Sequence, residues 1–126
     1  MSIIDQLNRP LHDLRISVID RCNFRCPYCM PQEEYNHSYQ FLKKEEWLSF
    51  DEILRLIRIL VELGVRKVRL TGGEPLLRPN LDQLVRQIST IKEIEDIALT
   101  TNGSNLTDHL DSLQNAGLKR MTISLD

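Results

Sequence analysis

The stretch Cys22-Asn23-Phe24-Arg25-Cys26-Pro27-Tyr28-Cys29 holds all three cysteines of the 126-residue chain. Their spacing is Cys-x3-Cys-x2-Cys, and no thiol is left over for a disulfide or a core position, which predicts a metal site. A closed zinc site has four ligands, as do most iron–sulfur clusters. Three thiolates on a four-iron cluster would leave one iron without a protein ligand, and a small molecule could bind and react at that open position.

The same thiols allow a second interpretation. With a distant fourth ligand such as His37, they would form a zinc site of the common kind with three cysteines and one histidine. The chain would then be a non-catalytic zinc- or iron-binding module. The spacing favours the open cluster over this alternative.

The composition limits the possible partners. Hydrophobic residues make up 41% and charged residues 27%, as in an ordinary soluble protein, and 126 residues suffice for one domain. A net charge of -2 gives no electrostatic footprint for a nucleic-acid polymer, and no apolar run approaches the roughly 18 residues of a membrane span. The first ten residues lack the pattern of a signal peptide. Because clustered free thiols fit a reducing compartment, we expect a cytoplasmic protein with no nucleic-acid or membrane partner.

Strand and helix patterns alternate along the chain. After a lead-in arm over 1–13, a β-rich run over 14–19 leads into the cysteines, and a long connection over 30–48 follows them. Ser49 and Glu52 have the spacing of a capping box and begin a helix that Gly64 ends. We expect the remaining elements to be a strand over 67–70, a helix over 80–91, a strand over 96–100, a helix over 107–116 and a strand over 120–125. This order predicts an α/β fold with one parallel sheet wrapped by helices.

Each predicted strand has one apolar face and one polar or small face. The apolar faces must meet the helices, so the other faces would form the concave polar interior of an open or partial barrel that holds a ligand. The alternative is that these polar faces are simply exposed to solvent. Arg15 and Arg69 lie on the polar face, and two inward guanidinium groups predict an anionic substrate with planar acceptors.

Four candidate loops each follow the carboxyl end of a predicted strand. They are the cysteine loop, Gly72-Gly73-Glu74-Pro75, Thr101-Asn102-Gly103 and Ser124-Leu125-Asp126. Active sites of parallel α/β folds lie at this edge. The glycine pair would let the backbone approach a ligand closely, although the same four residues also suit a plain turn.

The cysteine motif with Tyr28, followed by Gly-Gly-Glu-Pro after the second strand, resembles the radical S-adenosylmethionine (SAM) enzymes. Four segments, 13–31, 68–78, 99–103 and 116–126, resemble more closely one family among them, the GTP 3′,8-cyclases of molybdenum cofactor synthesis. The resemblance covers the chain from Leu11 onward. It implies a parallel (βα)n partial TIM-like barrel, interrupted after the fourth strand, with residues 1–126 as the amino-terminal portion of a single barrel domain.

The resemblance also implies roles for individual residues. A 4Fe–4S cluster would be held by three thiolates, those of Cys22, Cys26 and Cys29. SAM would chelate the open iron through its amine and carboxylate, and it would contact three further residues: Tyr28, Gly73 and Ser124. Three residues of the polar faces would reach GTP: Arg15, Arg69 and Thr100. No acid–base catalyst is assigned.

The family's reaction is a radical cyclisation. The reduced cluster cleaves SAM to a 5′-deoxyadenosyl radical, which abstracts hydrogen from the ribose of GTP, and the sugar carbon then bonds to C8 of guanine to give 3′,8-cyclo-7,8-dihydro-GTP. A flavodoxin-type electron donor and a homodimer are the further partners that the resemblance implies. The family's enzymes are longer and carry a second three-cysteine cluster, so we expect this chain alone to be a partial or inactive fragment. The alternative within the superfamily is a different enzyme, such as a peptide-modifying one.

Overall fold

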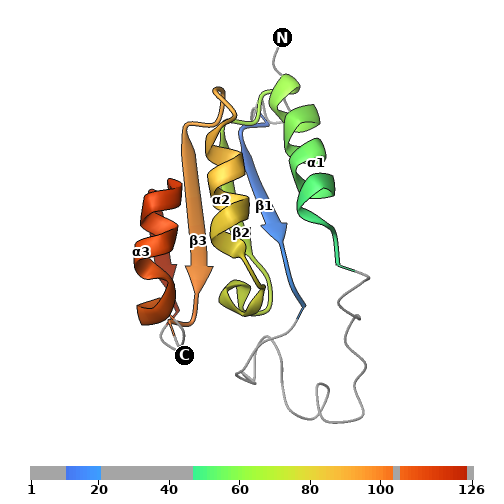
Figure 1. Ribbon diagram of the computed structural model, residues 1–126. Coiled ribbons are helices and arrows are strands. Elements are labelled where there is room, and N and C mark those ends of the chain that lie inside the picture. Colours follow the sequence, from blue (N-terminus) through green and yellow to red (C-terminus); the bar gives the residue numbers. More distant parts are fainter. Residues whose placement is uncertain (1–10, 21–46, 104–105, 125–126) are drawn as a thin grey trace.

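The computed structural model describes residues 11–20, 47–103 and 106–124, which Figure 1 shows as coloured ribbon. The elements are, in order, β1 (Asp13–Ser17), α1 (Phe50–Glu62), β2 (Lys67–Thr71), the short 3-10 helix η2 (Pro75–Leu77), α2 (Leu81–Ser89), β3 (Asp96–Thr101), α3 (Leu106–Ala116) and β4 (Arg120–Ile123). The predicted alternation of strands and helices is confirmed. The predicted cluster ligands and two neighbouring candidates lie outside the described residues: Cys22, Cys26, Tyr28, Cys29 and His37.

The four strands form one parallel sheet in the order β1-β2-β3-β4. Arg15 on β1 lies opposite Arg69 on β2, and the same row continues through Ala98 on β3 to Arg120 on β4. Each strand therefore lies beside the next one in the sequence, and all carboxyl ends meet at one edge. Within the described residues the sheet does not close, and β1 and β4 form its two edges. This arrangement is the open, partial barrel that was predicted.

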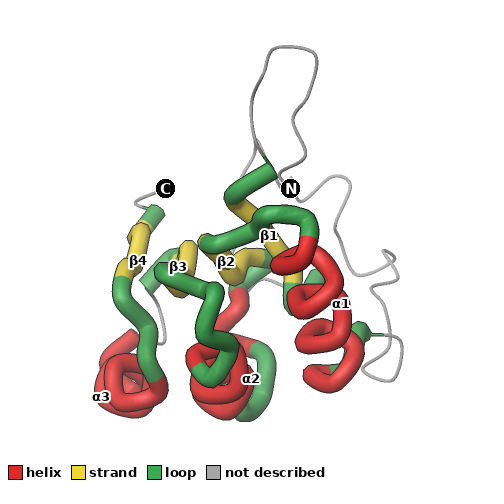
Figure 2. The backbone as a smooth tube through the Cα atoms, turned by 90° about the horizontal axis from the view of Figure 1, so that it is seen from above, coloured by secondary structure: helices red, strands yellow, loops and turns green. Residues whose placement is uncertain are grey.

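The three α-helices cover one face of the sheet. Figure 2, which looks down on the strands, shows α1, α2 and α3 on the same side of the sheet. The core lies between these layers, and its most completely buried side chains include Ile53, Ile57, Leu70, Leu84, Ile88, Leu99 and Leu113. The strand residues that join this core are those of the predicted apolar faces, such as Ile16, Val68 and Leu70. The other face has no helix over it in the described part of the chain.

The capping box at the start of α1 is confirmed. The Glu52 amide donates to Ser49 Oγ at 3.1 Å, and the Ser49 amide donates to Glu52 Oε1 at 2.9 Å. Hydrogen bonding to the Glu52 carboxylate from Ser49, chiefly from its backbone amide and also from its side chain, lowers the pKa of Glu52 below its usual value. At the other end, Gly64 adopts a φ of 117°, which strains any side chain, and an added Cβ would lie 2.8 Å from the Leu11 carbonyl oxygen. The chain therefore leaves α1 at the position where the sequence predicts its end.

Several element boundaries differ from the sequence-based expectation by one or two residues. The second helix begins at Leu81 rather than at Asn80, because Asn80 has a left-handed φ of 62° and serves as the residue before the helix. β1 ends at Ser17, yet the chain beyond it stays bonded to β2, since the Val18 amide donates to the Thr71 carbonyl at 2.9 Å. β4 ends at Ile123 rather than at 125. These differences leave the order of elements unchanged.

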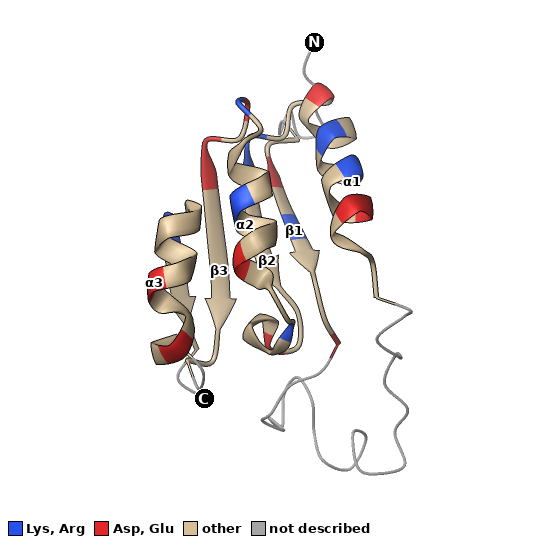
Figure 3. Ribbon diagram, in the orientation of Figure 1, with Lys and Arg blue, Asp and Glu red and all other residues tan. Residues whose placement is uncertain are grey.

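Charged side chains of both signs occur on α1 and α2, whereas α3 has Asp108 and Asp111 and no Lys or Arg. In Figure 3, the blue segments of α1 lie between red segments at its two ends, and both colours occur on α2, so neither sign extends along the whole of either helix. Among residues 11–20, 47–103 and 106–124, no helix combines the length and apolar character that crossing a membrane requires.

Candidate functional site

The polar face of the sheet carries the residues that were predicted to reach the substrate. Arg15 is exposed and Arg69 is half-buried, while the residues beside them in each strand turn toward the helices. Because these two arginines lie opposite each other on β1 and β2, their side chains share one face of the sheet. The structure thus brings Arg15 and Arg69 together on the uncovered face.

Arg69 is the centre of a hydrogen-bond network across three strands. Its Nη1 donates to Thr100 Oγ1 on β3 at 2.9 Å and to Thr122 Oγ1 on β4 at 3.0 Å. Thr100, which the family resemblance placed on the GTP side, is therefore in direct contact with Arg69. Thr122 received no role from the sequence, although its place in the strand alternation already put it on the polar face. The two hydroxyl groups hold the guanidinium in one orientation, and its Nε and Nη2 have no hydrogen-bond partner among the described residues.

A hollow of about 240 Å³ lies beside this network, toward the amino ends of the strands. Its charged lining consists of four cations and two carboxylates: Arg15, Lys67, Arg69, Arg120, Asp13 and Asp96. Asp96 is paired, since its Oδ2 lies 3.0 Å from Arg120 Nε. The surplus of cations makes this face suited to a polyanion, and the guanidinium groups suit planar acceptors such as phosphate oxygens.

The turn after β2 is shaped by a contact within the chain. A Cβ on Gly72 would lie 2.6 Å from the Ile19 carbonyl oxygen, and the Gly73 amide donates to that oxygen at 2.8 Å. The close approach that glycine permits at position 72 is therefore to the end of the β1 segment rather than to a ligand. Since the Gly73 amide is already used, a contact between Gly73 and SAM would have to come from its carbonyl oxygen.

Glu74 ties this turn to the end of β3. Its side chain is 1% exposed, and it accepts hydrogen bonds from the amides of Leu76 and Asn102 at 2.9 and 2.8 Å. The Thr101 hydroxyl lies 2.8 Å from both carboxylate oxygens. A buried carboxylate with this many donors fixes two loops at the functional edge relative to each other. The sequence offered one signal for this role, namely an acidic residue inside a turn that otherwise consists of glycine and proline.

Ser124 lies at the same edge, immediately after β4. Its amide donates to the Thr101 carbonyl at 2.9 Å, so Ser124 and Glu74 are connected through one residue. The structure therefore gathers the turn of Gly73, the end of β3 and Ser124 at the carboxyl edge. Two of the three predicted SAM contacts are thus near one another, and the third, Tyr28, lies outside the described residues.

The cysteine segment is flanked by described residues. It follows Asp20 and precedes Trp47, and the chain just before it is bonded to the end of β2 through Val18. Within the described ranges, no group of three or more metal-binding side chains occurs. Thiolates are the ligands that iron–sulfur clusters use, so the chemistry of Cys22, Cys26 and Cys29 fits a 4Fe–4S cluster with one iron left open.

The sequence profile of the radical SAM superfamily matches residues 16–126. The chain therefore belongs to the radical SAM superfamily, and its cofactors are a 4Fe–4S cluster and SAM. This membership confirms the expected fold and cofactors and favours the cluster over the zinc module.

Within the superfamily, the chain is similar to enzymes named GTP 3′,8-cyclase. It is 53% identical over 124 residues to the one from Staphylococcus saprophyticus, 56% to that from Staphylococcus haemolyticus and 57% to that from Staphylococcus epidermidis strain RP62A. Each alignment covers 98% of this chain but only 36% of the relative, so the chain spans about a third of the length of these relatives.

A solved structure shares the fold. The crystal structure of BtrN in complex with AdoMet and 2-DOIA superposes with a TM-score of 0.67 at 22% sequence identity, covering 90% of this chain and 45% of BtrN. An open form of BtrN gives a TM-score of 0.62 at 23% identity, covering 88% of this chain and 48% of that one. At these identities the similarity concerns the fold alone.

Proposed function

We propose that residues 1–126 are the amino-terminal portion of a single radical SAM barrel domain in a GTP 3′,8-cyclase. The proposed reaction converts GTP to 3′,8-cyclo-7,8-dihydro-GTP in molybdenum cofactor synthesis. Its support is the similarity to GTP 3′,8-cyclases over nearly the whole chain. A cytoplasmic location, a flavodoxin-type electron donor and a homodimeric assembly belong to the same proposal and rest on the resemblance to that family.

The observation that carries the substrate assignment is the fixed guanidinium of Arg69. Thr100 and Thr122 orient it through Nη1, and its Nε and Nη2 have no partner in the described part of the chain. These N–H groups are available to a planar or anionic acceptor, and Arg15 offers a second fork one strand away. GTP supplies both kinds of acceptor, on its phosphates and on its base.

The residues proposed to contact SAM and those proposed to bind GTP lie in different parts of the sheet. Gly73 and Ser124 lie at the carboxyl edge, where they are proposed to contact SAM, and Arg15 and Arg69 lie on the open face, where they are proposed to hold the nucleotide. When bound, the reduced cluster and SAM supply a 5′-deoxyadenosyl radical that abstracts hydrogen from the substrate. The role of this chain's own side chains is to hold the nucleotide so that its ribose faces the edge, since orientation contributes much of the rate of such a step.

The test is product analysis on the whole protein. After anaerobic reconstitution of its clusters, it is incubated with dithionite, SAM and either GTP or ATP, and the products are separated and identified by mass spectrometry. The expected result is 5′-deoxyadenosine together with a cyclised nucleotide from GTP and none from ATP. Cleavage of SAM with unchanged GTP, under conditions in which the clusters are complete, would contradict the proposed substrate.

A further inference from the structure

Arg78 connects three parts of the chain that are distant in sequence. It follows η2, and its backbone amide donates to the Pro75 carbonyl at 3.0 Å, so it belongs to the same turn as Glu74. Its Nη1 donates to the Val18 carbonyl at 2.7 Å, and its Nη2 donates to the Leu48 carbonyl at 2.6 Å. One guanidinium therefore bonds the main chain on both sides of the segment 21–46, which contains the three cysteines.

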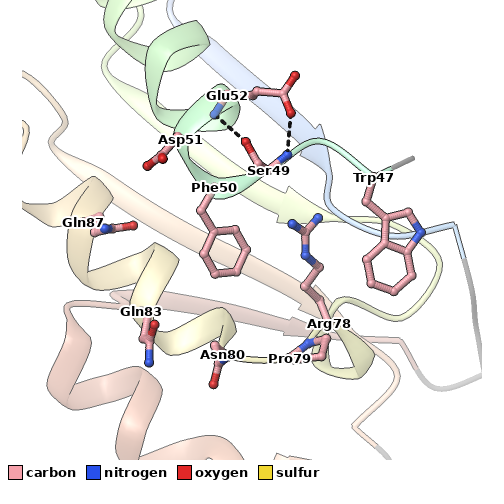
Figure 4. Close-up of a pocket in the computed structure, with 10 residues that line it drawn as sticks. All are labelled: Trp47, Ser49, Phe50, Asp51, Glu52, Arg78, Pro79, Asn80, Gln83 and Gln87. Carbon is pink, nitrogen blue, oxygen red and sulfur yellow. Dashed lines mark hydrogen bonds between the residues drawn. The ribbon is translucent and has the colours of Figure 1, made fainter. Parts of the chain in front are cut away.

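Two aromatic rings hold this guanidinium in place. Its central carbon lies 4.7 Å from the centre of the Phe50 ring and 5.3 Å from that of Trp47, within the range of cation–π attraction. Figure 4 shows the Arg78 side chain reaching up between these two rings, at the groove of about 580 Å³ near the starts of α1 and α2. Partial burial lowers the pKa of Arg78 from its usual value.

The geometry is specific to arginine. The two acceptors are main-chain carbonyls, and a planar fork can donate to both at once while its face stays against the rings. A lysine ammonium at the same position would keep the charge but would lose the fork and the flat stacking surface. Leu48 is exposed, and Val18, whose side chain belongs to the core, takes part in the bond only through its carbonyl oxygen.

We propose that Arg78 is a positioning residue for the 4Fe–4S cluster, because it holds Val18 and Leu48, which flank the cysteine segment, at a fixed place relative to the Gly-Gly-Glu-Pro turn. The cluster and SAM would then keep a fixed position relative to each other. The reason is that Arg78 belongs to the turn proposed to contact SAM and also bonds the Val18 and Leu48 carbonyls on either side of the cysteine segment. The inference rests on membership of the radical SAM superfamily and not on GTP as the substrate. If the protein does not convert GTP, the inference about Arg78 still stands.

The experiment compares Arg78→Gln and Arg78→Lys with the unchanged whole protein after anaerobic reconstitution. Three quantities are measured: iron and sulfide per chain, the rate at which cluster absorbance is lost under an iron chelator, and the midpoint of thermal unfolding without cluster. We expect Arg78→Gln to lose its cluster at least tenfold faster and Arg78→Lys at least threefold faster. If Arg78→Gln does not fold, Arg78→Lys decides, and cluster loss at the unchanged rate in a folded Arg78→Lys protein would overturn the proposal.

Two control variants separate positioning from general stability. Arg86→Gln removes an exposed arginine from α2 and should change neither the rate of cluster loss nor the unfolding midpoint. Leu113→Ala opens the core under α3, away from the cysteine segment, so it should lower the unfolding midpoint while leaving cluster loss near the unchanged rate. If Leu113→Ala accelerates cluster loss as much as Arg78→Gln does, Arg78 acts only through general stability and the proposal is wrong.

Discussion

Arg69 on β2 donates a hydrogen bond to Thr122 on β4 at 3.0 Å, across the strand that lies between them. Thr100, on that middle strand, accepts a second hydrogen bond from the same nitrogen at 2.9 Å. The contact shows that the side chains of three strands on the uncovered face form one network. It also means that the orientation of this guanidinium does not depend on a ligand, because two hydroxyl groups already hold it.

Replacement of Arg69 should weaken binding of GTP without affecting the cluster. In the whole protein, Arg69→Ala removes charge-assisted hydrogen bonds of about 1.5–3 kcal/mol, which corresponds to a roughly 10- to 150-fold loss of affinity. Affinity is measured by anaerobic titration calorimetry, and iron content is measured alongside. Arg55→Ala, on the exposed side of α1, is the matched control and should bind GTP normally. Unchanged affinity in Arg69→Ala would show that Arg69 only stabilises the sheet.

Replacement of Glu74 should destabilise the functional edge. In Glu74→Gln, one carboxylate oxygen becomes an NH₂ group, which cannot accept a hydrogen bond. Because the Leu76 and Asn102 amides donate to different carboxylate oxygens, one of these two amides loses its acceptor. A buried donor left without an acceptor costs about 1–3 kcal/mol, and urea unfolding of the cluster-free whole protein should show a loss of that size. Glu62→Gln, at the exposed end of α1, is the control and should unfold as the unchanged protein does. Equal stability of Glu74→Gln would mean that the edge rearranges at no cost.

Each cysteine should be required for the cluster. The variants Cys22→Ala, Cys26→Ala and Cys29→Ala each leave two thiolates, which hold a four-iron cluster poorly. Iron and sulfide analysis, absorbance and paramagnetic resonance after anaerobic reconstitution should show that stable 4Fe–4S binding is lost in all three. Full iron loading in any one of them would contradict its assignment as a ligand. Zinc in place of iron in the unchanged protein would revive the alternative of a zinc module.

The 126-residue chain expressed by itself should cleave SAM but should not cyclise GTP. It carries three cysteines, enough for one cluster. The family resemblance implies a second three-cysteine cluster that binds the substrate, and the 126 residues contain no cysteines for it. Exposed strand edges at β1 and β4 should also make it prone to associate, which size-exclusion chromatography would detect. With dithionite, SAM and GTP, we expect 5′-deoxyadenosine without a cyclised nucleotide. Formation of the cyclised nucleotide by this chain would show that the remaining part is not needed.

The sequence predicted the elements well because their signals are local. The capping box of Ser49 and Glu52 and the end of α1 at Gly64 each depend on residues within a few positions of one another. The division of each strand into an apolar and a polar face is equally local, and it placed Arg15 and Arg69 on one surface before any register was known.

The contacts that organise the site could not be predicted in this way. Thr101 lies 27 positions from Glu74, and Arg78 reaches carbonyls 60 and 30 positions away. Every residue has a main-chain carbonyl, so the residue types at positions 18 and 48 could not identify Val18 and Leu48 as hydrogen-bond acceptors for Arg78. The register of the sheet, which made Thr122 a neighbour of Arg69, is likewise a property of the fold and not of a segment.

Because the helices cover only one face of the sheet, the strand residues fall into two groups that tolerate change differently. Substitution of Val68 or Leu70 would alter the core and cost stability, whereas substitution of Arg69, which lies between them, alters the uncovered face of the sheet and its hydrogen-bond network. Along each strand, residues that pack in the core alternate with residues on the uncovered face. The positions that determine stability are therefore different from those that determine which ligand binds. A sheet of this kind can acquire a new substrate through changes at every second position while its interior stays the same.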